Sequence, residues 1–301
     1  MRKSGIMLPI ITAAGVVLGT AARMLGIART DMKTGLLNHD STLLCNLLYY
    51  GAILLTAVCA VLAAGFGENG GLRRAKASDI VDGKAIAFGA GLLLIALCAA
   101  YEGISQFDQL GGNGSGGGLN PSVFLMIIDL AFALILGIIA FVTLYKKEFK
   151  PGLGFSYAFG GLYFVARGIY CFMNRMAIAT FPEYLIEALS VVLGALFFVM
   201  AGKLLSGNEG RLTKNFFCGW GAAVSAMTLS SAIATGLAKL FFSEEISLRI
   251  VFSAAEAERN FQFLHGIDAY YLAFPPLVHI AVGVFAFAGI CALCSAGSQN
   301  D

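Results

Sequence analysis

Long apolar runs alternate with short polar stretches along the whole chain, and this pattern predicts a bundle of membrane-spanning helices. Eight runs approach the roughly 20 residues that a helix needs to cross the hydrocarbon core of a bilayer. Each run is continuously apolar instead of alternating every second residue, which argues against a transmembrane β-barrel. We therefore predict an all-α protein, one transmembrane domain over 1–301, with eight helices paired in four hairpins. The predicted spans are 6–26, 43–65, 85–105, 121–145, 152–174, 181–201, 216–238 and 272–295.

The composition supports a protein surrounded by lipid. Hydrophobic residues make up 58% of the 301 residues and charged residues 13%, with a mean hydropathy of +0.80. A soluble domain is usually about one-quarter charged, so this chain has too little polar surface to face water on all sides. The formal net charge of +2 is also too small for a nucleic-acid partner. We expect the lipid bilayer as the partner and no nucleic acid.

The positive charges of the loops predict the orientation. With the N-terminus inside, twelve lysines and arginines fall on the inner side: Arg2, Lys3, Arg73, Arg74, Lys76, Lys84, Lys146, Lys147, Lys150, Lys203, Arg211 and Lys214. Seven fall on the outer side: Arg23, Arg29, Lys33, Arg175, Lys239, Arg249 and Arg259. Because cytoplasmic loops carry the excess of positive charge, both termini are expected in the cytoplasm, in a bacterial-type cell membrane. The first run resembles a signal peptide, but its length and the seven spans after it favour a retained helix.

Two outer loops differ in character. Loop 106–120 contains Gly111–Gly118 and is expected to be a flexible linker; it also holds a GxGxxG pattern, but no strand precedes it, so a dinucleotide site is not expected. Loop 243–271 is expected to contain a short helix on the outer surface. Ser253 with Glu256 fits a capping box, and Glu245 with Arg249 fits an i,i+4 pair.

Nearly every span carries one polar or charged residue towards its outer end. An unpaired charge at the centre of a membrane helix costs at least about 2.5 kcal/mol. Four of these residues are expected near the outer interface, where long side chains can reach the headgroups: Arg23, Asn46, Glu102 and Lys239. Four lie deeper and require partners: Asp129, Arg167, Glu187 and His279.

The fifth and sixth spans carry facing polar stripes. Tyr163, Arg167 and Tyr170 follow one another at spacings of three or four, so they share one helical face. Glu187 lies on the next span at a similar counted depth. A short connection makes the two spans antiparallel neighbours, which predicts a buried ion pair between Arg167 and Glu187. Asp129 lies at a comparable depth and could compete for the same arginine.

Two interpretations of these residues fit the sequence. In the first they form a substrate-binding site, made of Arg167, Glu187, Asp129, His279, Tyr163 and Tyr170. Arg167 would hold an anionic group by its planar fork, and the acids and His279 would handle a cation or a proton. In the second interpretation the charges are structural ion pairs that hold helices together.

Small and hydroxyl residues on two other spans are expected to serve packing. Gly15 and Gly19 form a GxxxG pattern, and a hydroxyl stripe on the seventh span includes Ser225 and Thr228. The seven cysteines all lie in or beside apolar spans, and we interpret them as small packing residues.

No catalytic motif is present in the sequence. It contains no Walker A motif and no HExxH, and its histidines lack metal-ligand spacing, so no metal, cofactor or catalytic residue is expected. The leading hypothesis is a small-solute permease or solute-binding membrane subunit with its site in the outer half. The alternative is a non-catalytic scaffold that binds a membrane or cytoplasmic protein, and an intramembrane enzyme is a distant third.

Overall fold

The computed structural model describes residues 4–30, 39–66, 85–110, 121–146, 157–174, 182–208, 210–242, 246–249 and 270–299. In these ranges the chain forms eight helices and two short strands. The helices are α1 (Ser4–Ala28), α2 (His39–Phe66), α5 (Ala85–Leu110), α6 (Pro121–Lys146), α7 (Ala158–Asn174), α8 (Pro182–Leu205), α9 (Arg211–Phe241) and α11 (Leu277–Gln299). The prediction of an all-α helical bundle is confirmed.

The outer surface of the bundle is apolar. Leucine, isoleucine and phenylalanine side chains point outwards on most helices; Leu43 is 81% exposed and Phe141 is 68% exposed. An apolar surface of this extent is unstable in water but suits lipid, in which the intrahelical bonds already satisfy the backbone. Seven of the described helices are long and apolar enough to cross a membrane, and α7 is a shorter apolar helix. The chain is therefore a multi-pass membrane protein.

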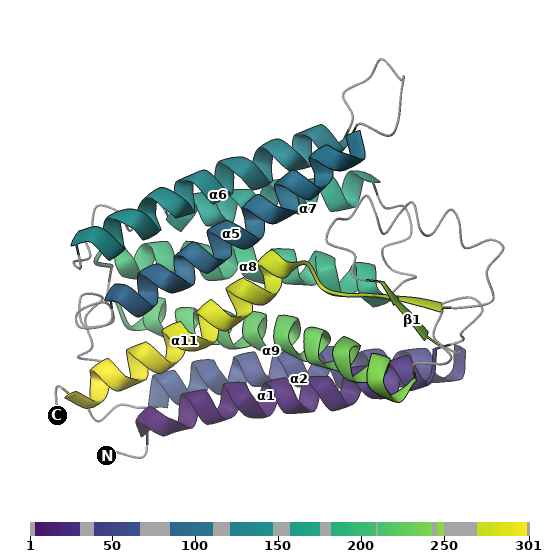
Figure 1. The fold of residues 1–301 in the computed structure, drawn as a ribbon. Helices are drawn as coiled ribbons and strands as arrows, with labels where there is room; N and C mark the ends of the chain where they lie inside the picture. The colour runs from purple at the N-terminus through teal and green to yellow at the C-terminus, as the bar shows by residue number, and fades with distance from the viewer. Residues whose placement is uncertain are drawn as a thin grey trace.

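The helices form two groups joined by a middle layer (Figure 1). α9 is the central helix of the first group and packs against α1 and α2. The second group is the α5–α6 hairpin with α7 packed against α6. α8 and α11 lie between the groups, because each packs against α9 on one side and against α7 or α5 on the other. α1 begins and α11 ends at the same end of the bundle, as an even number of crossings requires (Figure 1).

Glycines and hydroxyls allow the first group to pack closely. A Cβ added to Gly15 would lie 2.9 Å from Cβ of Thr56 on α2, and one added to Gly19 would lie 2.9 Å from Oγ of Ser230 on α9. The GxxxG pattern is therefore a close-packing surface, as predicted. Ser225 donates to the carbonyl of Gly221 in its own helix at 2.7 Å, or to that of Gly283 on α11 at 2.9 Å. The hydroxyl of Ser225 therefore joins α9 to α11.

Replacing Gly15 with alanine should lower the free energy of unfolding by about 1–3 kcal/mol, the usual range for overpacking a tight contact. The Thr56 side chain cannot move aside easily, because its hydroxyl is bonded to the carbonyl of Ala52 at 2.7 Å. Gly51→Ala is a matched control, since a Cβ there meets nothing within 4 Å. Unfolding in mixed micelles measures both variants. Equal stability of the two would mean that α1 and α2 are not in close contact.

Two of the helix ends that differ from the prediction bear on the site. α5 continues to Leu110, five residues beyond the predicted end of the span, so Gln106 belongs to the helix and not to the outer loop. α11 begins at Leu277 and not at 272, because Pro275 and Pro276 lack the N–H groups of a helix interior. Residues 111–120, with the glycine linker, lie outside the described residues.

The segment before α11 contains extended chain. β1 (Ile246–Arg249) pairs in parallel with β2 (Tyr270–Ala273), with Ile246 opposite Tyr270. The helix expected in 243–271 is therefore wrong at 246–249, where Arg249 belongs to a strand and cannot form an i,i+4 pair. Ser253 and Glu256, the expected capping box, lie outside the described residues.

Candidate functional site

Arg167 is the centre of a buried ion cluster. Its side chain projects from α7 and is fully buried, with 0% exposed. Nη1 donates to Oε2 of Glu102 on α5 at 2.7 Å and lies 3.3 Å from Oδ1 of Asp129 on α6. Both acids are also fully buried. One guanidinium therefore joins three helices through two carboxylates.

Asp129 is held by three donors. Besides Arg167, the hydroxyl of Tyr163 donates to Oδ1 at 2.8 Å, and Nε2 of Gln106 donates to Oδ2 at 2.9 Å. The Tyr163 hydroxyl also accepts a bond from Nη1 of Arg167 at 2.7 Å, so it lies between the cation and the acid. Its ring stacks on Phe132 with centroids 3.9 Å apart, which fixes the direction of the hydroxyl.

Glu102 connects the cluster to the beginning of α11. Its second oxygen, Oε1, accepts a bond from the backbone N–H of Val278 at 2.9 Å. Val278 is the second residue of α11, and the first N–H groups of a helix have no partner within the helix. A carboxylate at this position also interacts favourably with the helix dipole. Glu102 therefore caps a helix that starts at the level of the cluster.

The start of α11 lies inside the bundle. Glu102 is eight residues (102 to 110) before the end of α5, about 12 Å along the helix at 1.5 Å per residue. Since Val278 contacts Glu102, α11 begins at a similar depth, and the extended chain of β2 leads from it towards the end of the bundle at which α5 ends (Figure 1). Non-helical backbone at membrane depth occurs where it is buried in protein or lines a cavity. The N-terminus of α11 thus lies beside the charge cluster, with non-helical chain before it.

The prediction that Arg167 pairs with Glu187 is wrong among the described residues. Arg167 pairs with Glu102 and Asp129, and Glu187 adds only a weaker electrostatic attraction. Glu187 is half-buried, and its Oε1 lies 3.8 Å from the thiol of Cys171, one helical turn further out than Arg167. Glu187 is only five residues from the start of α8, so it lies nearer the outer end than the cluster does.

Glu102 was expected near the outer interface with its charge reaching the headgroups, but the structure buries its side chain. Its side chain is 0% exposed and holds both Arg167 and Val278. Arg23 is also buried, with 5% exposed, whereas Lys239 is exposed as expected.

Of the predicted site residues, the structure brings Arg167, Asp129 and Tyr163 into direct contact. His279 follows Val278, is 2% exposed, and its ring centroid lies 5.6 Å from that of Phe164. Tyr170 is buried one turn outside Arg167, in a small cluster with Leu125 and Cys171. Glu102 and Gln106 were missed as site residues. Their i,i+4 spacing on one face of α5 was the available signal.

Two polar edges of the cluster have no hydrogen-bond partner within the described part of the chain. They are Nε and Nη2 of Arg167 and Oε1 of Gln106, and all three atoms are buried. With both acids ionised, Arg167, Glu102 and Asp129 carry a formal charge of +1 − 1 − 1 = −1. The cluster therefore has unused hydrogen-bonding capacity and one negative charge in excess.

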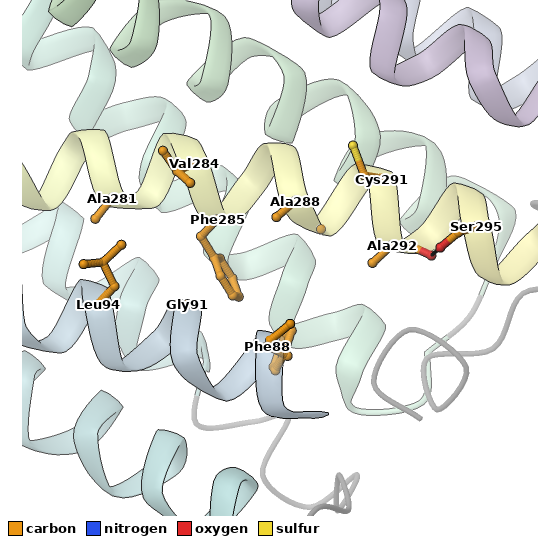
Figure 2. Close-up of a pocket in the computed structure, with 12 residues that line it drawn as sticks. Phe88, Gly91, Leu94, Ala281, Val284, Phe285, Ala288, Cys291, Ala292 and Ser295 are labelled. Atoms are coloured by element: carbon orange, nitrogen blue, oxygen red, sulfur yellow. Dashed lines mark hydrogen bonds between the residues drawn. The ribbon is translucent and has the colours of Figure 1, made fainter. Parts of the chain in front are cut away.

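An apolar cavity lies elsewhere in the bundle. It has a volume of about 570 Å³ and lies between α5 and α11, lined by residues such as Phe88, Gly91, Phe285 and Ala288 (Figure 2). These positions belong to the first half of α5 and to the middle of α11, so the cavity is nearer the end where α5 begins. Its lining lacks charged groups, and it does not include the residues of the ion cluster.

The chain matches no family model, and no curated protein or solved structure is significantly similar to it. Among the described residues, no group of three or more histidine, cysteine, aspartate or glutamate side chains could hold a metal ion. The ion cluster offers hydrogen-bond donors, acceptors and charge.

Proposed function

We propose that this multi-pass membrane protein binds a small charged solute at the ion cluster, as a permease or as the solute-binding subunit of one. The N-terminus of α11 beside the cluster, preceded by non-helical chain, is the observation that carries the proposal. In transporters, solutes bind where a helix is interrupted near the middle of the membrane, because the free backbone groups and the dipole of the helix end meet the solute there. Here Glu102 accepts the hydrogen bond of the Val278 N–H at the N-terminus of α11.

The position of the cluster between helix groups supports this proposal. Arg167 and Glu102 belong to the α5–α6–α7 group, whereas α11 belongs to the middle layer that packs on α9. Alternating access usually moves one group of helices against another around a site between them. The described state is closed, because Arg167, Glu102 and Asp129 are fully buried. Solute access requires α11 to separate from α5, which would break the bond between Glu102 and Val278.

With both termini in the cytoplasm, as the loop charges predict, the cluster lies in the outer half of the membrane. Tyr163 and Asp129 would then form the wall of the site on the side of α6 and α7. His279 would lie next to the helix end, on the side of α11.

A structural scaffold is the second candidate, and the complete burial of the cluster favours it. A buried guanidinium with two carboxylates joins α5, α6 and α7, and through Glu102 it also joins α11. In this alternative, the protein serves as a membrane subunit for a protein partner, and the charges only hold the helices in place.

Solute binding by the purified protein in lipid nanodiscs separates the two candidates. A panel of charged solutes is screened for an increase in the melting temperature, and each hit is followed by uptake into proteoliposomes. We expect at least one hit with the wild type and a changed affinity for it in Asp129→Asn, with Lys239→Gln as the control at an exposed position. If Asp129→Asn folds and binds or moves every solute as the wild type does, the cluster is not the site.

A further inference from the structure

The unused edge of Arg167 defines the chemistry of the solute. A guanidinium has five N–H donors, and Nε and Nη2 together carry three of them. Neither atom has a hydrogen-bond partner within the described residues, and the side chain is 0% exposed. Buried donors of a charged group are seldom left unmatched, since the loss of hydration is then uncompensated. The Nε and Nη2 donors of Arg167 can therefore bind a hydrogen-bond acceptor from a solute.

The geometry of the free edge favours a planar oxyanion. Glu102, Tyr163 and Asp129 all contact Nη1, so the side of the guanidinium formed by Nε and Nη2 is left. The N–H groups on that side are parallel, and two oxygens of one carboxylate match them in a bidentate arrangement. A single water has only one oxygen and cannot accept both bonds in this way.

Charge balance then limits the anion to a small negative charge. The cluster already carries a formal charge of −1, so a monocarboxylate brings it to −2 and a phosphate dianion to −3. Excess charge in a desolvated site is strongly unfavourable. The groups that act on Arg167 do not offset it, because Glu102 from α5, Asp129 from α6 and Glu187 from α8 are acidic and Tyr163 is neutral. The basic side chain of His279 on α11 follows Val278, the residue that contacts Glu102.

We propose that the Nε–Nη2 edge of Arg167 binds the carboxylate of a small monocarboxylic acid, and that a proton or a monovalent cation enters with it at Glu102 or Asp129. This assignment rests on the proposed function, because it names the solute of the same site. Protonation of either acid, or a monovalent cation bound at one of them, offsets the negative charge that the solute adds. Anion binding and cation binding are then coupled through the shared guanidinium.

Isothermal titration of the full-length protein in nanodiscs with sodium propionate tests the assignment, with sodium phosphate and methylammonium chloride as the comparison probes. We expect saturable binding of propionate and weaker binding of phosphate. Arg167→Lys keeps the charge but removes the parallel N–H groups, so propionate binding should weaken on the order of 10- to 100-fold. Arg23→Lys changes a buried arginine on α1 outside the cluster and should bind propionate as the wild type does.

A second variant keeps the test decisive if Arg167→Lys fails to fold. Glu102→Gln removes one negative charge and preserves the shape, so propionate should bind about 10-fold or more tightly than to the wild type. A merely structural cluster would show no gain. Titrations with choline in place of sodium distinguish the two compensating charges: unchanged affinity assigns a proton, and weakened affinity assigns sodium.

The outcomes separate this assignment from the proposed function. If propionate does not bind to the wild type or to Glu102→Gln, or binds equally to Arg167→Lys, the carboxylate assignment is wrong. If methylammonium then binds in a manner that depends on Asp129, the site is confirmed with a cationic solute. If neither these probes nor the solute panel bind, both proposals fail.

Discussion

Replacing Arg167 with methionine should lower the free energy of unfolding by about 3–5 kcal/mol, the usual cost of removing one partner of a buried ion pair. The substitution leaves two fully buried carboxylates, Glu102 and Asp129, without their cation. The Tyr163 hydroxyl also loses a donor at 2.7 Å. Unfolding in mixed micelles, followed by circular dichroism, measures the loss.

A neutral triple variant provides the control for charge. Arg167→Met combined with Glu102→Gln and Asp129→Asn removes the uncompensated charges and should recover a large part of the stability. Arg29→Met, at an exposed position, should change stability little. Wild-type stability of the single Arg167→Met variant would show that the guanidinium does not hold the cluster. Wild-type solute binding by the triple variant would show that the cluster is structural.

Glu102→Ala should be the second most damaging change, with a loss of about 3 kcal/mol or more. It removes the acceptor of Arg167 at 2.7 Å and of the Val278 N–H at 2.9 Å, and it leaves a helix end uncapped inside the bundle. Glu187→Ala is the matched control on α8. Because Glu187 is half-buried and has no ion pair to Arg167 in the described contacts, its loss should cost less than about 1 kcal/mol.

The same unfolding experiment compares the two glutamates directly. The sequence alone predicts that Glu187 is the partner of Arg167, so the order of the two effects tests the arrangement of the helices. A larger loss for Glu187→Ala than for Glu102→Ala would contradict the described cluster and favour the pairing of α7 with α8.

The apolar runs predicted the helices well because the length of a run and the thickness of a bilayer impose the same constraint. The helix ends were less predictable. Gln106 is polar and was assigned to a loop, but its bond to Asp129 at 2.9 Å keeps it in the helix. Pro275 and Pro276 fall inside the predicted last span, but in the structure they precede the helix.

The partners of Arg167 were only partly predictable. Depth along the helices identified Asp129 as a competitor, and the structure confirms that contact. Depth could not choose between helices, since Glu102 and Asp129 both lie eight residues from their helix ends. The choice depends on which helices are neighbours, and that arrangement follows from side-chain packing between segments far apart in the sequence.

The cluster also dictates an order during biosynthesis. Glu102 precedes Arg167 by 65 residues and Val278 by 176 residues along the chain. At ribosomal rates, Glu102 leaves the ribosome about 3–13 s before its counterion. During that interval neither Glu102 nor Asp129 has its buried cation, so the second hairpin cannot settle stably in lipid by itself. The fifth helix brings the guanidinium that pairs with both acids, and the last helix to be synthesised completes the cluster.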